Sequence, residues 1–233
     1  MKFNIHAGHN PEGKTGCGAV GLLKESTENR KVKNEVIRLL KQEGHTVNDC
    51  TVDNGINQND ILKKIVEKCN KNTVDWDISI HFNSGAKDST GNGKSTGTEV
   101  LVYGNNQEKN TMASNICKRI EGLGFKNRGV KINNNLYFLK NTKNKALLIE
   151  CCFVDDADDI ALYNYKTMAK AIVEGLLSKT IKDIDKGLTG ASTGSEVYYR
   201  VCVGAYKEKS NALKKIEELK SKGIEAFIAV YNK

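Results

Sequence analysis

Apolar and polar positions along the first 178 residues follow two different periods. Apolar runs and alternation at every second residue predict strands at 3–5, 45–52, 76–82, 98–103, 136–139 and 146–153. Apolar residues spaced three and four positions apart predict helices at 32–40, 61–66, 112–123 and 160–177. This alternation predicts an α/β fold, with an open, mostly parallel, twisted sheet flanked by helices. The nearly continuous apolar run at 146–153 predicts a central strand.

The last part of the chain has a pattern of its own. Residues 179–195 are polar and rich in glycine, which is typical of a flexible linker. Residues 196–233 then predict two strands, at 197–203 and 224–230, on either side of a helix at 212–219. Two strands and one helix cannot cover both faces of their sheet. We therefore expect this small C-terminal βαβ module to pair with a second copy, which makes the protein a homodimer.

Composition places the chain among globular proteins. Hydrophobic residues make up 39% and charged residues 27% of the chain, with one proline, which excludes a wholly disordered or collagen-like protein. No run approaches about 18 apolar residues, so we expect no membrane span. Polar residues interrupt the N-terminal segment before an apolar run develops. We therefore expect no secretory signal, and synthesis in the cytoplasm.

Charge and cysteine content limit the classes of partner and the kinds of cysteine chemistry that we expect for this chain. The net charge is +8, but acidic and basic residues are interspersed and aromatic residues make up only 6%, so we expect no nucleic-acid partner. The basic excess is denser after Ser178, which fits a polyanion such as the bacterial cell wall. The seven cysteines include no Cys-x-x-Cys pair, which argues against a zinc ribbon or redox motif. We expect buried, reduced thiols.

Three of four chemically active side chains lie at or near strand ends, and the fourth precedes a helix. His9 follows the first strand, and His81 lies at the end of the third. Glu25 stands just before the first helix, and Glu150 lies within the strand at 146–153. Ligands gather at the carboxyl ends of strands in open α/β sheets. Two histidines and one carboxylate are a common catalytic zinc set, and a second carboxylate can take a proton from the attacking water.

The residues alone leave other roles open. His9 also suits an ordinary turn, and Glu25 also suits the first turn of a helix. His6 lies within the first strand, where a core or supporting role fits better than metal binding, and His45 resembles a turn residue. Glu150 differs, because a carboxylate between two apolar stretches is costly to bury without a partner or a task. A functional role is therefore favoured for Glu150.

Together these residues form an ordered set of motifs. The motifs are Gly8-His9, Glu25 ahead of Asn29, Ser79-Ile80-His81-Phe82-Asn83 and Leu147-Leu148-Ile149-Glu150-Cys151-Cys152-Phe153. In this order they resemble the zinc-dependent N-acetylmuramoyl-L-alanine amidases of the amidase-3 type, over residues 1–178. The stretch at 125–131, followed by 136–139, is similar to endolysins of phages that infect clostridia.

The resemblance implies a site and a reaction. His9, Glu25 and His81 match the zinc ligands of the family. Glu150 matches its catalytic glutamate, which activates the attacking water. The reaction implied is hydrolysis of the amide bond between N-acetylmuramic acid and L-alanine in peptidoglycan. Asn83 is a candidate for substrate contact or for support of the neighbouring ligand. Where many members have Gly-Phe after the glutamate, this chain has Cys-Cys-Phe.

The C-terminal module resembles the opening half of a sporulation-related repeat (SPOR) domain. The resemblance rests on residues 199–206, 211–212 and 222–227. SPOR domains bind peptidoglycan glycan strands through a β-α-β-β-α-β fold, of which only the first β-α-β is present here. The resemblance implies that two tails pair into one fold, bind the cell wall, or both, whereas dimerisation alone is the simpler alternative.

The domain organisation we expect is a catalytic domain at 1–178, a linker at 179–195 and the SPOR-like module at 196–233. The expected function is cell-wall lysis by a phage endolysin that is made in the cytoplasm and acts on the wall after release. A host autolysin with the same activity, a non-catalytic peptidoglycan-binding protein and another zinc peptidase are the alternatives.

Overall fold

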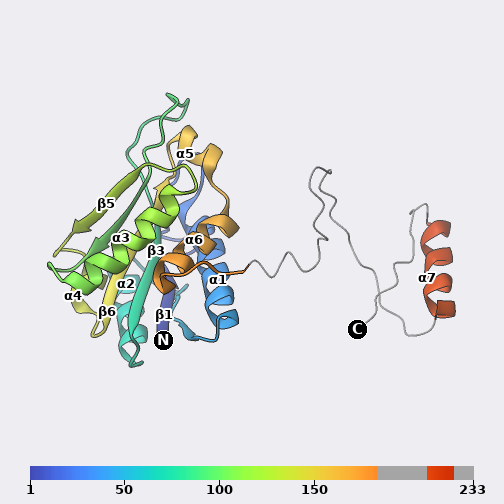
Figure 1. The fold of residues 1–233 in the computed structure, drawn as a ribbon, viewed down its shortest axis with the longest axis horizontal. Helices are drawn as coiled ribbons and strands as arrows, with labels where there is room; N and C mark the ends of the chain where they lie inside the picture. Colours follow the sequence, from blue (N-terminus) through green and yellow to red (C-terminus); the bar gives the residue numbers. More distant parts are fainter. Residues whose placement is uncertain (183–208, 223–233) are drawn as a thin grey trace. The chain divides into compact units, whose positions relative to one another are not determined.

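Residues 1–182 and 209–222 are described by the computed structural model of the chain (Figure 1). The chain divides into two compact units, Met1–Lys182 and Asp183–Lys233. The first unit contains all four candidate site residues. Within the described parts of the chain, no helix is long and apolar enough to cross a membrane.

The second unit is described only over one helix. This helix, α7 (Lys209–Ser221), includes the helix predicted at 212–219. The predicted strands at 197–203 and 224–230 lie outside the described residues, as do Cys202 and most of the predicted linker.

The first unit is built on a six-stranded sheet in the order β2-β1-β3-β6-β4-β5. The strands are β1 (Lys2–Ala7), β2 (Thr46–Asp49), β3 (Trp76–Asn83), β4 (Thr98–Val102), β5 (Asn127–Ile132) and β6 (Lys145–Phe153). Neighbouring strands are parallel except for β4 and β6, which run antiparallel. The predicted open, mostly parallel sheet is confirmed, and the apolar strand β6 is central in it.

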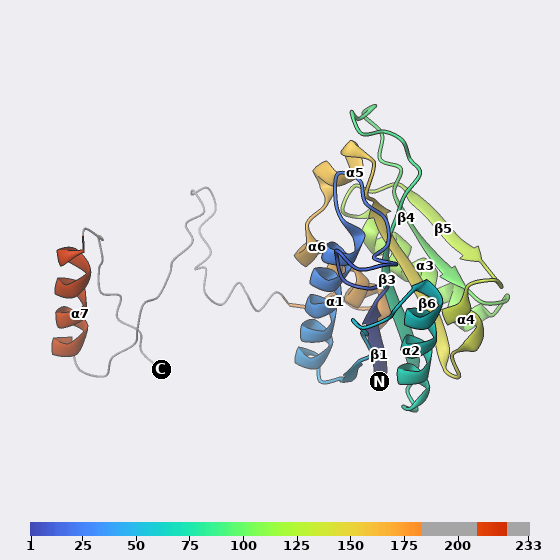
Figure 2. The same ribbon diagram turned by 180° about the vertical axis from the view of Figure 1, so that it is seen from behind.

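Helices cover both faces of this sheet. They are α1 (Glu25–Gln42), α2 (Gln58–Asn70), α3 (Gln107–Glu121), α4 (Tyr137–Asn141), α5 (Ala157–Leu162) and α6 (Tyr165–Leu177). Helices α1, α3 and α6 pack together over the larger core, and α2 and α4 over the smaller one. Figure 1 shows α3 in front of the sheet, and the view from behind in Figure 2 brings α2 to the front.

Strand alternation assigns each side chain of the central strands to one face. Ile80 of β3 and Ile149 of β6 belong to the larger core under α1, α3 and α6. His81 and Glu150 are the next residues on these strands, so their side chains project from the opposite face. The larger core therefore holds the two strands in place through their apolar side chains. His81 and Glu150 are polar residues that alternate with these apolar residues along the strands.

Residues 136–139 are not a strand, and the sequence prediction was wrong here. Residues Tyr137–Asn141 form α4, and its residues Phe138 and Leu139 are buried in the smaller core. A four-residue apolar run suits a strand and a buried helical turn equally well, so its pattern cannot separate the two.

The single helix predicted at 160–177 is also wrong, because it is interrupted and forms α5 and α6. The side chain of Asn164 accepts hydrogen bonds from the N–H groups of Lys166 and Thr167, and so caps the start of α6. An Asn cap inside an apolar periodicity is easily overlooked, since the apolar spacing continues on both sides of it.

The strand β5 was not predicted, and β2 is shorter than the predicted strand at 45–52. The side chains of β5 are half-buried or exposed, so the strand carries no apolar alternation. It lies at the edge of the sheet beside β4. Edge strands with polar side chains give little periodic signal.

Candidate metal and catalytic site

The fold brings the four site residues to one end of the sheet. β1 ends at Ala7, shortly before His9, and the register of β3 and β6 sets His81 beside Glu150. Glu25 is the first residue of α1, whereas the sequence analysis placed it just before that helix. All four line one hollow beyond the carboxyl ends of β1 and β3, where open α/β sheets gather their ligands.

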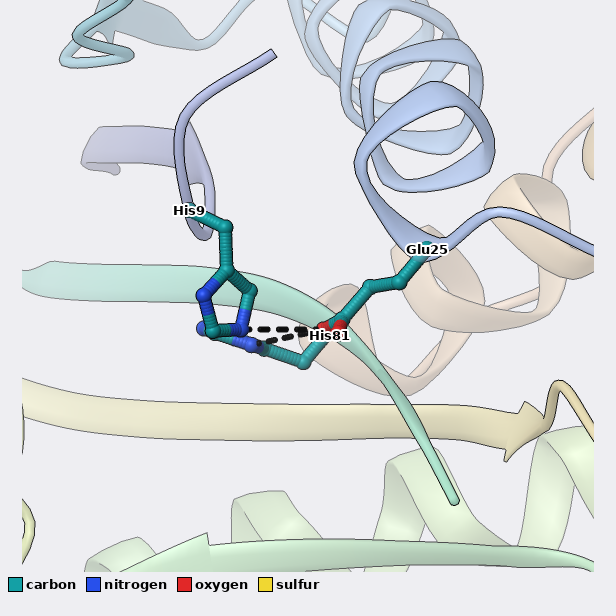
Figure 3. Close-up of side chains that lie close together, drawn as sticks. All are labelled: His9, Glu25 and His81. Carbon is teal, nitrogen blue, oxygen red and sulfur yellow. Dashed lines mark hydrogen bonds and ion pairs between the residues drawn. The ribbon is translucent and has the colours of Figure 1, made fainter. Parts of the chain in front are cut away.

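The carboxylate of Glu25 faces two imidazole rings (Figure 3). Its Oε1 atom lies 3.0 Å from Nδ1 of His81 and 3.3 Å from Nε2 of His9. The two rings meet edge to face, with centroids 4.8 Å apart. One candidate ligand atom from each of the three residues lies within 4.8 Å of the other two. All three side chains can therefore reach a single ion.

Glu25 is held by the backbone as well as by the histidines. Its Oε1 accepts a hydrogen bond from the N–H of Phe82 at 3.1 Å, and its Oε2 accepts one from the N–H of Ala19 at 2.8 Å. Burial alone raises the pKa of Glu25, but hydrogen bonds from His81 and His9 outweigh it and hold the pKa far below its usual range. Glu25 is therefore ionised at neutral pH.

The protonation of His81 also suits metal binding. Burial lowers the pKa of His81, although hydrogen bonding to Glu25 opposes this shift. The imidazole is therefore neutral at neutral pH, which is the form that binds a metal.

Two glycines make room for the histidine rings and the carboxylate. A Cβ atom on Gly8 would lie 2.0 Å from Cε1 of His81, and one on Gly18 would lie 2.5 Å from Oε2 of Glu25. Gly18 also has a φ of 80°, which L side chains rarely adopt. A larger residue at either position would displace a candidate ligand.

Glu150 stands beside this group without joining it. Its Oε2 atom is inaccessible to solvent and has no hydrogen-bond partner in the structure. Burial raises the pKa of Glu150 to about 8, and the charges of Glu25 and Glu99 add to the shift. A half-buried carboxyl that can hold or release a proton near neutral pH is suited to acid–base work.

The hollow over the site has a volume of about 530 Å³. Asn83 lines it, as do residues 16–19 and Gln58. Nδ2 of Asn83 donates to Oε1 of Glu99 at 3.0 Å, and Oε2 of Glu99 accepts from Nε of Arg128 at 2.8 Å. The amide of Asn83, a candidate for substrate contact or support, is thus fixed at the wall of the hollow.

The other two histidines are not part of the group of three candidate ligands. His6 is buried and its ring packs edge to face on Phe138, 4.6 Å between centroids. Burial and the neighbouring His81 lower the pKa of His6 to about 3, so it is neutral. His45 follows a turn glycine, and its Nδ1 lies 3.1 Å from the N-terminal amine of Met1.

The described cysteines are free thiols, and all but Cys17 are buried. Burial raises the pKa values of Cys151 and Cys152 well above the usual range, so these thiols stay protonated. The two positions that follow Glu150 in the family motif therefore carry small, unreactive side chains. Cys17 lines the hollow near His9.

The residues present fit a catalytic zinc ion. Two imidazoles and one carboxylate form the donor set of many catalytic zinc sites, and they leave a position for water or substrate. Glu25 is ionised and His81 is neutral, as metal ligands must be. The unpartnered oxygen of Glu150 lies beside this donor set, where a group that exchanges protons with water belongs.

A family model described as N-acetylmuramoyl-L-alanine amidase, Amidase_3, matches residues 4–179. The chain belongs to the Amidase_3 family. The predicted site residues lie in the matched region, as do all the described strands and helices apart from α7 and the first residues of β1.

Among solved structures, the chain is similar to the catalytic domain of the CD27L endolysin targeting Clostridia Difficile. The two are 29% identical, with a TM-score of 0.68, over 78% of this chain and 99% of that one. An uncharacterised protein of Clostridium perfringens is 34% identical over 187 residues, which cover 78% of this chain and 53% of that protein. The sporulation-specific N-acetylmuramoyl-L-alanine amidase of Bacillus subtilis is 27% identical over 157 residues, 66% of this chain and 56% of that amidase. The chain spans about half the length of the curated relatives it matches.

The residues that hold the site in place were not predicted from the sequence. Gly18 and the N–H group of Ala19 lie against Glu25, and Arg30 bonds the carbonyl of His9. The only signal for the first two was the glycine-rich stretch at 12–21, which indicates a loop with special backbone conformations. Arg30 lies on a polar helix position that no pattern distinguishes.

Proposed function

We propose that the chain hydrolyses the amide bond between N-acetylmuramic acid and L-alanine in bacterial peptidoglycan, in a zinc-dependent reaction. The observation that carries the proposal is the convergence of His9, Glu25 and His81 beside the unpartnered carboxyl of Glu150. Membership of the Amidase_3 family supports the choice of this bond.

In this proposal His9, Glu25 and His81 hold the zinc ion. When bound, zinc polarises the scissile carbonyl, and its charge lowers the pKa of neighbouring groups. Glu150 takes a proton from water as the water oxygen adds to the carbonyl carbon. It then passes that proton to the nitrogen of L-alanine as the carbon–nitrogen bond breaks. The products are the lactyl carboxyl group of N-acetylmuramic acid and the free amine of L-alanine.

Metal content and wall lysis, measured on the same sample, test this proposal. We expect one zinc ion per chain, loss of lysis on treatment with a chelator, and recovery when zinc is restored. Digested walls should gain L-alanine amines without new reducing sugars, because an amidase leaves the glycan strand intact. A metal-free protein with full lytic activity would overturn the proposal.

A variant at Glu150 separates metal binding from proton transfer. Glu150→Gln should keep its zinc and lose lysis by about a hundredfold or more, the usual contribution of a general acid–base group. Glu67→Gln, an exposed position on α2, is the control and should keep both properties. Unaltered lysis in Glu150→Gln would remove Glu150 from the mechanism.

We further propose that the enzyme is a phage endolysin, made in the cytoplasm, which reaches the wall after release. The similarity to the CD27L endolysin supports this role. A host autolysin with the same activity is the alternative, because the Bacillus subtilis amidase is also similar. Deleting the gene from an inducible lysogen distinguishes them: an endolysin is required for lysis after induction, and an autolysin is not.

A further inference from the structure

The backbone of His9 adopts a conformation that neighbouring groups must hold. Its φ is 65°, in the left-handed region, which costs a residue with a Cβ about 1 kcal/mol or more. His81, by contrast, lies within β3, whose ladder to β1 and β6 fixes its backbone. Of the two histidines proposed to bind zinc, His9 is therefore the one whose placement depends on contacts outside a strand.

Helix α1 provides two of those contacts, besides the hydrogen bond from the N–H of Asn10 to the carbonyl of Gly16 at 3.0 Å. Nδ2 of Asn29 donates to the carbonyl of Gly8 at 2.9 Å, and Nη2 of Arg30 donates to the carbonyl of His9 at 3.0 Å. These carbonyls belong to the two peptide groups on either side of the His9 Cα atom. The helix that begins with Glu25 thus also holds both peptide groups next to His9.

The guanidinium of Arg30 is itself fixed on several sides. Its Nε and Nη2 donate to Oδ1 of Asp53 at 3.2 and 2.6 Å, and its Nη1 donates to the carbonyl of Ser26 at 2.8 Å. The Arg30 side chain is only 18% exposed. A planar group held in this way is a rigid support, which the single flexible ammonium of a lysine cannot reproduce.

We propose that Arg30, together with Asn29, is a positioning residue that sets the zinc affinity of the site by holding His9 in its left-handed conformation. The inference rests on the proposed function, since it assumes that the site binds zinc. Without these bonds, φ of His9 can relax to negative values. That change turns the Cα–Cβ bond and carries Nε2 away from Glu25 and His81.

The charge of Arg30 predicts the opposite effect on zinc binding. A positive side chain near the site repels a cation, so an effect of charge alone would make Arg30→Ala bind zinc more tightly. Positioning predicts weaker binding, because a ligand is displaced. The sign of the change therefore separates the two explanations.

Zinc affinity of the full chain, measured by competition with a chromogenic chelator, tests the inference. We expect Arg30→Ala and Asn29→Ala each to weaken zinc binding by about 10- to 100-fold, the usual effect of removing a group that orients a metal ligand. Arg30→Lys should recover only part of the loss. Arg38→Ala is the matched control on the same helix, where Arg38 pairs with Glu35, and should stay within about twofold of the wild type.

Asp53→Asn provides a second, milder variant. Asp53 is 61% exposed, so its replacement should leave the fold intact while weakening the anchor of Arg30. We expect a smaller loss of zinc affinity than in Arg30→Ala, with an unchanged unfolding midpoint of the metal-free protein. If Arg30→Ala does not fold, Asn29→Ala and Asp53→Asn carry the test.

The outcomes are distinct. Zinc affinity equal to or tighter than that of the wild type in the folded variants would overturn the positioning role, as would a lower unfolding midpoint with unchanged affinity. A wild-type chain that binds no zinc would instead overturn the proposed function, and this inference with it.

Discussion

Among single residues, Glu150 has the clearest expected effect on how the stability of the fold depends on pH. Its pKa is raised from the ordinary 4.5 to about 8 in the metal-free fold. Between these two values the folded protein keeps a proton that the unfolded chain releases. The free energy of unfolding therefore falls as pH rises across this window, and the fall ends above the folded pKa.

A comparison of metal-free wild type and Glu150→Gln isolates this effect, because glutamine does not titrate. In urea unfolding between pH 5 and pH 8, the stability of Glu150→Gln relative to wild type should rise by up to about 1.4 kcal/mol per pH unit, most steeply midway between the two pKa values. A difference that stays constant with pH would show that Glu150 is not protonated in the folded chain.

Gly18 offers a second test at the residue scale, with a matched control in the same loop. Gly18 and Gly13 have nearly equal φ values, 80° and 81°, so alanine meets similar backbone strain at both. A Cβ on Gly18 would collide with Glu25, whereas one on Gly13 would meet nothing within 4 Å. Gly18→Ala should lose zinc binding and lysis, and Gly13→Ala should lose only about 1 kcal/mol of stability. Equal zinc content in the two variants would contradict the close packing at Gly18.

Single residues of the site differ in how well the sequence predicts them. His81 and Glu150 could be named because strands place them at fixed positions, and a carboxylate in an apolar strand is conspicuous. Arg30 could not, because its role depends on the path of the loop that carries His9. Loop paths follow from tertiary packing, which no local pattern encodes.

Among the elements, the segment at 155–159 holds a long loop through its carboxylates. The loop at 84–97 connects β3 and β4, and it extends beyond the sheet near α5 (Figure 1). Asp155 accepts hydrogen bonds from the N–H groups of residues 85–87, and Asp158 from those of residues 92–94. The order of this loop therefore depends on carboxylate–backbone bonds.

We expect Asp158→Asn to loosen the loop while leaving the fold intact. All three N–H groups converge on Oδ2 of Asp158, and the oxygen of a neutral amide accepts these bonds more weakly than a charged carboxylate oxygen does. Amide hydrogen exchange at residues 92–94 should speed up by about tenfold, with an unchanged midpoint of global unfolding. Glu67→Gln on α2 is the control for loss of one acidic charge. Unchanged exchange at 92–94 would show that Asp158 does not hold the loop.

Helices and strands were predicted from the sequence where one of their faces is continuously apolar. The strands β3 and β6 and the helices α1, α2 and α3 were predicted for that reason, although α1 begins at Glu25, well before the helix predicted from residue 32. The edge strand β5 lacks an apolar face, and the short helix α4 has too few residues to reveal a period.

The whole chain divides into two units, and buried contacts define where the first unit ends. The first unit extends past residue 178, because Ile181 is buried in the larger core. The N–H of Ile181 also donates to Oε1 of Glu174 at 3.1 Å. The first unit therefore ends after Lys182, and a shorter truncation removes part of its core.

Two truncations test both this boundary and the proposed pairing of tails. A chain of residues 1–182 should keep its zinc and its unfolding midpoint. A chain of residues 1–178 should lose about 2 kcal/mol of folding stability, because it lacks the buried side chain of Ile181.

We propose that the module at 196–233 pairs with a second copy, so the full chain should be a dimer by light scattering and 1–182 a monomer. A dimeric 1–182 would place the interface in the first unit, and a monomeric full chain would overturn tail pairing. Binding of the full chain and of residues 1–182 to intact walls then tests whether the paired tails hold the proposed enzyme on its substrate, because two linked modules raise the effective concentration of the second contact. If the full chain binds walls no better than 1–182, the tail serves dimerisation alone.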